Sequence, residues 1–120
     1  HMEKKILLID DVEYIGFILR KNLEKYDNLI LQYMESGEKG SEALKNEKYD
    51  LLILDLSLYD KDGPEILEEL KVQQNPIPTI VISANYQKIE DSKKYNALAY
   101  FKKPIDFDKL NETIEKALNL

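Results

Sequence analysis

The 120-residue sequence contains no cysteine and no tryptophan, and its only histidine is the first residue. Without cysteine the chain has no disulfide, no thiolate nucleophile and no cysteine-ligated metal, which fits a reducing compartment, so we expect a cytoplasmic location. We interpret residues 1–2 as a cloning remnant and expect one domain over residues 3–120. Catalysis by serine–histidine–aspartate or cysteine–histidine groups within one chain is then excluded.

Long apolar runs and an excess of positive charge are also missing. Apolar runs such as residues 51–54 are four residues long, whereas a bilayer-spanning helix needs roughly 20. The 17 basic and 23 acidic residues give a net charge of −6, and binding to a phosphate backbone requires clustered positive charge. We therefore expect neither membrane insertion nor nucleic-acid binding by this domain.

Three short, continuous apolar runs, residues 6–9, 51–54 and 80–82, predict strands. Unbroken apolar character is typical of parallel strands that helices cover on both faces. Shorter strands are predicted at residues 29–33 and 99–101. Apolar residues three and four apart predict helices between the strands. The predicted helices are residues 12–26, a short helix at 42–45 after a Ser36-Gly37 turn, residues 65–72 after Pro64, residues 87–95, and a last helix that starts near Asp106 or Asp108.

Strand and helix thus alternate five times, without a linker or an internal repeat. This order predicts an α/β fold with a five-stranded parallel sheet and helices on both faces. The chain is too short for an eightfold barrel, which takes about 250 residues. The expected architecture is a doubly wound, flavodoxin-like sandwich, in which ligands bind at the carboxyl ends of the strands.

Charged and polar residues follow four of the predicted strands. Asp10 and Asp11 come after the first strand, Asp55 after the third, Ser83 after the fourth and Lys103 after the fifth. The carboxyl ends of parallel strands share one edge of the sheet, so these side chains should converge. Crowded carboxylates repel one another unless a cation joins them, and Mg²⁺ prefers such oxygen ligands. The pattern indicates phosphoryl chemistry with an aspartate nucleophile.

With these motifs in order, the sequence resembles a receiver domain of the two-component response regulators over residues 3–120. The matching segments are residues 9–11, 55–63, 83–84 and 100–104. The resemblance implies the strand order 2-1-3-4-5 and a signalling switch rather than an enzyme, with self-phosphorylation and self-dephosphorylation as its only chemistry. It implies that Asp55 accepts a phosphoryl group from a phosphohistidine of a sensor histidine kinase or phosphotransfer protein.

The resemblance also implies roles for the other residues of the site. Asp11 and Asp55 would bind Mg²⁺ directly together with the backbone carbonyl of Ser57, and Asp10 would act mainly through metal-bound water. Ser83 and Lys103 would each contact a phosphoryl oxygen. Tyr100 would be the switch aromatic, whose ring turns inward when the Ser83 hydroxyl is drawn to the phosphate.

Some features depart from the family pattern or lie outside its motifs. Tyr59 stands where the family often has proline, a change expected to loosen the loop after Asp55. Asn96 replaces a common glycine and should preserve the turn, because asparagine tolerates a left-handed backbone. The Lys103-Pro104 bond is usually cis in the family. Glu65, Glu68 and Glu69 are interpreted as a solvated face.

A surface made by the helix at residues 87–95, the fifth strand and the last helix is, by the resemblance, a face for a homodimer partner or a downstream effector. Two other functions remain open. One is a docking module that no longer takes phosphate, although every acceptor-site residue is present. The other, an aspartate-nucleophile phosphatase of the haloacid dehalogenase type, normally needs a second acid two residues after the nucleophile, where Ser57 stands.

Overall fold

The computed structural model describes residues 2–120, so His1 of the expected cloning remnant lies outside the described residues. Strands and helices alternate along the whole chain. The strands are β1 (Lys4–Ile9), β2 (Leu29–Met34), β3 (Leu51–Asp55), β4 (Thr79–Ser83) and β5 (Ala99–Lys102). The helices are α1 (Glu13–Leu23), α2 (Gly37–Asn46), α3 (Gly63–Val72), α4 (Tyr86–Ser92) and α5 (Phe107–Leu118), with a 3₁₀ turn η1 (Lys93–Tyr95).

The five strands form one parallel sheet in the order β2-β1-β3-β4-β5. This confirms the predicted fold class and strand order. From β1 the chain passes outward to β2 on one side, and it then returns to β3 on the other side of β1. In doubly wound folds this reversal opens a crevice at the carboxyl ends of the strands, between β1 and β3.

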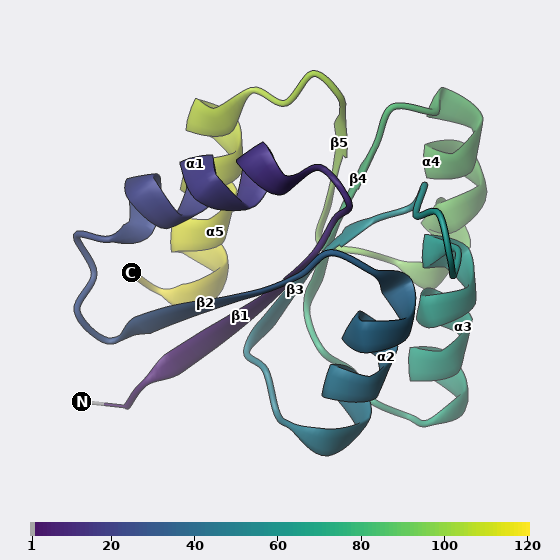
Figure 1. The fold of residues 1–120 in the computed structure, drawn as a ribbon, viewed down its shortest axis with the longest axis horizontal. Helices are drawn as coiled ribbons and strands as arrows, with labels where there is room; N and C mark the ends of the chain where they lie inside the picture. Colours follow the sequence, from purple (N-terminus) through teal and green to yellow (C-terminus); the bar gives the residue numbers. More distant parts are fainter. Residues whose placement is uncertain (1) are drawn as a thin grey trace.

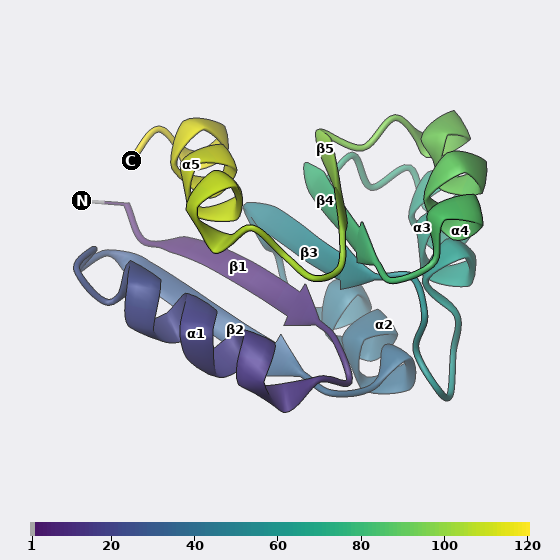
Figure 2. The same cartoon turned by 90° about the horizontal axis from the view of Figure 1, so that it is seen from above.

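Helices cover both faces of the sheet, as Figures 1 and 2 show: α1 and α5 lie on one face, and α2, α3 and α4 lie on the other. Each face has its own apolar core. One contains Ile15 and Leu19 of α1 with Leu110 and Ile114 of α5. The other contains Leu44 of α2 together with residues of α3 and α4.

The central strands are buried on both sides, as their continuous apolar runs predict. Every residue of β3 and β4 is buried, whereas β2 and β5 at the sheet edges are only partly buried. Burial in an apolar layer stabilises each such side chain by roughly 1.5–3 kcal/mol relative to exposure. The central strands are therefore a firm support for the polar residues Asp55 and Ser83 at their ends.

Two helix starts refine the sequence prediction. No turn separates Ser36 from α2: the hydroxyl of Ser36 accepts a hydrogen bond from the amide of Lys39 at 3.1 Å, so the helix begins at once with Gly37. Serine is among the best residues for this capping position. In α5 it is Asp106 that caps, accepting from the amide of Lys109 at 3.2 Å.

The turn before β5 is confirmed in the form that the sequence predicts. Asn96 ends η1 with a φ of 57°, in the left-handed region that asparagine tolerates. None of the helices formed by residues 2–120 has the length and apolar character needed to cross a membrane.

Candidate functional site

Three carboxylates converge where β1 and β3 end. Oxygen atoms of Asp10, Asp11 and Asp55 all lie within 4.8 Å of one another, as the common sheet edge predicts. Asp10 is 0% exposed and Asp55 is 2% exposed, whereas Asp11 is open to solvent. Two buried acids and one exposed acid thus make a negatively charged cluster that is partly open to solvent.

Backbone amides hold the two buried carboxylates in place. Oδ1 of Asp10 accepts from the amide of Val12 at 2.7 Å, and Oδ1 of Asp55 accepts from the amide of Ser57 at 2.9 Å. These contacts are those of ordinary aspartate-stabilised turns, in which the side chain bonds the backbone two residues on. Each aspartate therefore forms a turn through Oδ1, and its second oxygen, Oδ2, lies near the Lys103 ammonium.

Lys103 is the cation of the site. Its Nζ lies 3.0 Å from Oδ2 of Asp55, and it donates to Oδ1 of Asp10 at 3.3 Å. Burial lowers the pKa of Lys103, but the hydrogen bond to Asp55 and the charges of Asp10 and Asp55 outweigh it, so the pKa lies above its ordinary value. The ammonium group therefore stays charged and links the ends of β1, β3 and β5.

One ammonium group does not neutralise three carboxylates. Burial, and then the charge of Asp55, raise the pKa of Asp10 to about 6 against the opposing contacts from Val12 and Lys103. Oδ2 of Asp10 lies 3.2 Å from the Lys103 ammonium but, among the described residues, accepts no hydrogen bond. A buried carboxylate oxygen without a donor, beside two further carboxylates, is a donor set that fits a hard divalent cation.

Ser83, Ser57 and Tyr100 lie on the β3–β4–β5 side. The buried hydroxyl oxygen of Ser83 accepts from the amide of Asn85 at 3.0 Å and lies 3.4 Å from the Ser57 hydroxyl. Tyr100 is half-buried, and its hydroxyl oxygen accepts from the amide of Ala97 at 3.0 Å. Six of the seven predicted residues therefore lie in the loops and strand ends of the carboxyl edge. Tyr100 instead lies within β5, with its hydroxyl bonded in the turn that precedes this strand.

The backbone amide of Lys103 holds this residue beside the end of β4. The Lys103-Pro104 peptide bond is cis, as expected, and the amide of Lys103 donates to the carbonyl of Ser83 at 2.8 Å. Residue 103 thus continues the pairing of β5 with β4. The side chain can then lie across the carboxyl edge toward Asp55.

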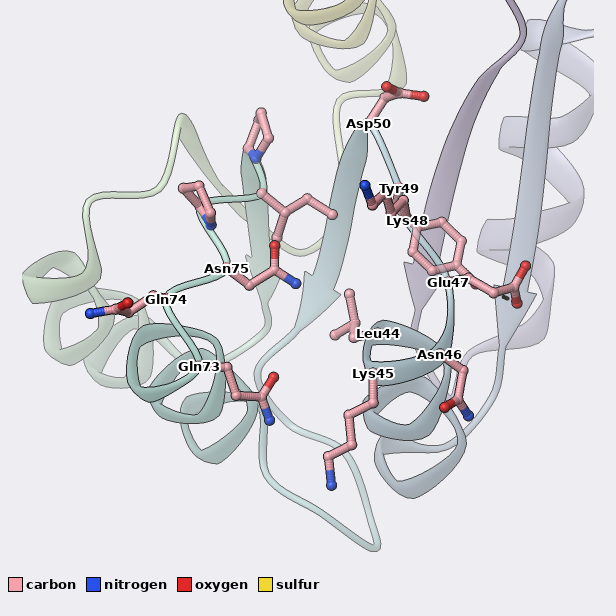
Figure 3. Close-up of a pocket in the computed structure, with 13 residues that line it drawn as sticks. Leu44, Lys45, Asn46, Glu47, Lys48, Tyr49, Asp50, Gln73, Gln74 and Asn75 are labelled. Atoms are coloured by element: carbon pink, nitrogen blue, oxygen red, sulfur yellow. Dashed lines mark hydrogen bonds between the residues drawn. The ribbon is translucent and has the colours of Figure 1, made fainter.

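A cavity lies at the opposite edge of the sheet. It measures about 930 Å³ and is lined by the segments before β3 and β4, including Tyr49, Asp50 and Asn75. Figure 3 shows mostly polar side chains around it, from the ends of α2 and α3. A cavity of this size fits a small ligand, but its polar groups do not converge as those of the carboxyl edge do.

Sequence reasoning missed the contacts that support the site. The Tyr33 hydroxyl donates to the carbonyl oxygen of Asp10 at 2.6 Å, and mainly burial raises the pKa of this tyrosine to about 12. The interpretation of Glu69 as a solvated residue is wrong, because its carboxylate pairs with Lys61 at 2.5 Å and accepts from the Ser41 hydroxyl. No periodicity or motif marks these long-range pairs.

Comparison with known proteins decides the family. The family model for the response regulator receiver domain matches residues 6–115. The chain belongs to the response regulator receiver domain family. Sporulation initiation phosphotransferase F of Bacillus subtilis (strain 168) is 32% identical over 121 residues, which cover 99% of this chain and 97% of that protein. This receiver is thus similar to a relative of nearly equal length.

Other relatives of this receiver are longer. The transcriptional regulatory protein ZraR of Escherichia coli (strain K12) is 34% identical over 122 residues, covering 98% of this chain but 27% of ZraR. Among solved structures, the response regulator TrrA of Thermotoga maritima, in complex with Mg(2+)-BeF, is 28% identical with a TM-score of 0.81 over 95% of this chain and 98% of TrrA. A receiver domain from Vibrio parahaemolyticus has a TM-score of 0.88 at 20% identity, over 98% of this chain and 92% of that one, and so shows the fold alone.

Proposed function

We propose that the chain is a phospho-accepting signalling switch, which takes a phosphoryl group from the phosphohistidine of a sensor histidine kinase or phosphotransfer protein onto Asp55. The observation that carries the proposal is the placement of Asp55: it is buried at the end of β3, among carboxylates, with the Lys103 ammonium 3.0 Å from Oδ2. The names of two relatives, a phosphotransferase and a regulator solved with Mg(2+)-BeF, support it.

In the proposed reaction a carboxylate oxygen of Asp55 forms a bond to phosphorus while the phosphorus–nitrogen bond of the phosphohistidine breaks. The electron pair of that bond stays on the imidazole, and an acyl phosphate results. Lys103 and the hydroxyl of Ser83 would each contact a phosphoryl oxygen, stabilising charge in a partly dry pocket. Ser83 already lies within the site, 3.4 Å from the Ser57 hydroxyl.

The proposal includes Mg²⁺, held by Asp11, Asp55 and the backbone carbonyl of Ser57, with Asp10 acting through metal-bound water. A bound divalent ion neutralises charge on phosphoryl oxygens during such a transfer. The unpartnered Oδ2 of Asp10 and the exposed carboxylate of Asp11 support this assignment. Asp10 must be deprotonated for this role, which its pKa of about 6 allows at neutral pH.

The switch itself would act through Ser83 and Tyr100. Drawing the Ser83 hydroxyl to the phosphate would release it from the Asn85 amide, and an inward turn of the Tyr100 ring would release the Ala97 amide. These changes would alter the face formed by α4, β5 and α5, where Tyr86 and Leu98 are 62% and 57% exposed. This face would bind a downstream effector or a second copy of the chain.

Intact-mass spectrometry after exposure to Mg²⁺ and acetyl phosphate tests the proposal. We expect one phosphoryl adduct on the wild-type chain, lost with a chelator and lost in Asp55→Asn. Asp50→Asn is the matched control, because Asp50 precedes the same strand at its other end, with its carboxylate on the Lys5 amide. It should be phosphorylated like the wild type.

Each other outcome points to a different function. An adduct retained in Asp55→Asn would refute the assignment of the acceptor. Absence of any adduct, with partner binding unaffected by Asp55→Asn, would indicate the phosphate-independent docking module. Continuous release of phosphate from simple phosphate esters would indicate the phosphatase.

A further inference from the structure

The loop that follows the proposed acceptor, residues 56–62, is closed tightly at its base. The amide of Gly63 donates to the carbonyl of Leu56 at 3.2 Å. A Cβ atom on Gly63 would lie 2.7 Å from the carbonyl oxygen of Asp55, so only glycine fits there. Leu56 and Leu58 anchor the first half of the loop in the core. What remains is its tip, residues 59–62.

Asp60 joins this tip to the start of α2. Its carboxylate accepts from the amide of Gly37 at 2.8 Å and from the amide of Glu38 at 3.1 Å. The first amides of a helix have no partner within the helix, and a negative charge there is favourable. The hydroxyl of the helix's own cap, Ser36, accepts from the amide of Lys39. Asp60 thus supplies from another element the cap that two amides of α2 otherwise lack.

Lys61 joins the same tip to α2 and α3 by its side chain. The side chain is only 9% exposed, and its Nζ donates to the Ser41 hydroxyl at 3.1 Å and pairs with Glu69 at 2.5 Å. The hydrogen bond to Glu69 keeps the pKa of Lys61 above its ordinary value, so the group stays charged. Truncating one member of such a largely buried pair leaves the other without a partner.

The backbone approach at this contact is unusually close. A Cβ atom on Gly37 would lie 2.4 Å from the carbonyl oxygen of Lys61. Glycine at the first position of α2 therefore lets the helix start rest directly on the loop. Charge, hydrogen bonds and steric fit all hold residues 60 and 61 against α2.

We infer that Asp60 and Lys61 are positioning residues, which hold the loop after Asp55 so that the backbone carbonyl of Ser57 is aimed into the acidic pocket. The inference rests on the proposed function, which uses this carbonyl as a metal ligand. Tyr59, 75% exposed, lacks the rigidity of a proline. The hydrogen bonds of Asp60 to two amides of α2 and the ion pair of Lys61 with Glu69 restrain the loop on the carboxyl side of Tyr59. They oppose the loosening that Tyr59 was expected to cause.

This role predicts a particular pattern of effects. A loop released from α2 would sample more positions of the Ser57 carbonyl, so Mg²⁺ binding would weaken. Once Mg²⁺ is saturating, the geometry around Asp55 and Lys103 would be restored. Loss of an outer contact that orients a ligand typically costs about 10-fold to 100-fold in metal affinity.

The experiment compares Lys61→Met with Lys39→Met. Lys39 is a matched control because it also forms an ion pair at 2.7 Å, with Glu35, but its side chain is 64% exposed. Isothermal titration calorimetry with MgCl₂ gives the Kd, and acetyl phosphate labelling at saturating Mg²⁺ gives the phosphorylation rate. We expect the Kd of Lys61→Met to rise about 10-fold, its rate at saturation to stay within about twofold, and Lys39→Met to match the wild type.

A second variant and a local readout keep the inference falsifiable if Lys61→Met does not fold. Asp60→Ala alters an exposed residue of the same loop and should raise the Kd in the same direction. Hydrogen exchange of the Gly37 and Glu38 amides should accelerate in Asp60→Ala. A Kd within twofold of the wild type in the folded variants would overturn the inference. If the wild type binds Mg²⁺ but is not phosphorylated, the proposed function is wrong. The comparison of Kd values would still decide whether Asp60 and Lys61 position the loop.

Discussion

The two edges of the sheet differ in how their charged side chains are arranged. The amino edge has a cavity of about 930 Å³, and its carboxylates are spread out, as with Asp50 on the Lys5 amide. The carboxyl edge brings Asp10, Asp11 and Asp55 within 4.8 Å and sets one ammonium among them. Both edges have the same supporting strands, so the difference lies only in which residues stand at the strand ends.

This difference shows that a cluster of buried charged side chains is a better indicator of a functional site than the presence of a cavity. Burying carboxylates costs free energy unless cations compensate it. Asp10 and Asp55 are buried with a single ammonium between them, whereas Asp50 at the amino edge is exposed. A cluster of buried charges that costs the fold free energy is a candidate functional site. The predictions below test whether the two edges can be changed independently.

The largest effect is expected for Lys103→Gln, which removes the cation of the carboxyl edge. Loss of one preorganised donor to a reacting oxyanion typically lowers a rate about 100-fold to 1,000-fold, and we expect this loss in the rate of Asp55 phosphorylation by acetyl phosphate. Lys102→Gln is the control, since Lys102 is exposed and next in sequence. A rate within threefold of the wild type for Lys103→Gln would show that the ammonium is only structural.

A smaller effect is expected for Asp10 and depends on pH. Its pKa of about 6 lies above the ordinary 3.8 because of burial and the charge of Asp55. The folded chain therefore holds this proton more tightly than the unfolded chain. The resulting stability is fully present below pH 3.8 and is lost as pH rises through about 6, in total at most about 3 kcal/mol.

The contribution of the Asp10 proton to stability can be measured by urea unfolding of the wild type and of Asp10→Asn. Both proteins are unfolded in the presence of chelator at several pH values between 4 and 7. We expect the free energy of unfolding of the wild type to fall relative to Asp10→Asn as pH rises, by about 2–3 kcal/mol. Added Mg²⁺ should restore stability to the wild type at pH 7 and do so less for Asp10→Asn. Parallel curves for the two proteins would contradict the raised pKa.

Much of the fold was predictable because local pattern and tertiary structure agree. The runs at residues 6–9, 51–54 and 80–82 are buried on both faces, and a strand of this kind is visible in sequence as unbroken apolar character. The start of α2 was missed because Ser36 and Gly37 suit a turn as well as a helix start. The Ser36 cap is local, but the Asp60 carboxylate that also holds the start of α2 comes from 23 residues away.

The site was predictable to the extent that its residues follow strands. The rule that parallel strands end at one edge is enough to predict that five residues converge: Asp10, Asp11, Asp55, Ser83 and Lys103. Contacts that depend on helix packing were not predictable: Lys61 reaches Glu69 and Ser41 only because α2 and α3 lie on the same face. A lysine and a glutamate eight residues apart in a polar segment look solvated in sequence.

The smallest effect is expected at the amino edge, where Asn96 lies in the turn before β5 and lines a cavity of about 530 Å³. Its φ of 57° costs a β-branched residue about 1–2 kcal/mol. Asn96→Val should therefore lower the free energy of unfolding by that amount, while Asn96→Gly should leave it within about 0.5 kcal/mol. Both variants should be phosphorylated by acetyl phosphate at the wild-type rate, because Asn96 lies at the amino edge and the acceptor site lies at the carboxyl edge. A rate loss in folded Asn96→Val beyond threefold would show that the two edges are coupled through β5, in which the Tyr100 hydroxyl is bonded to the neighbouring Ala97 amide.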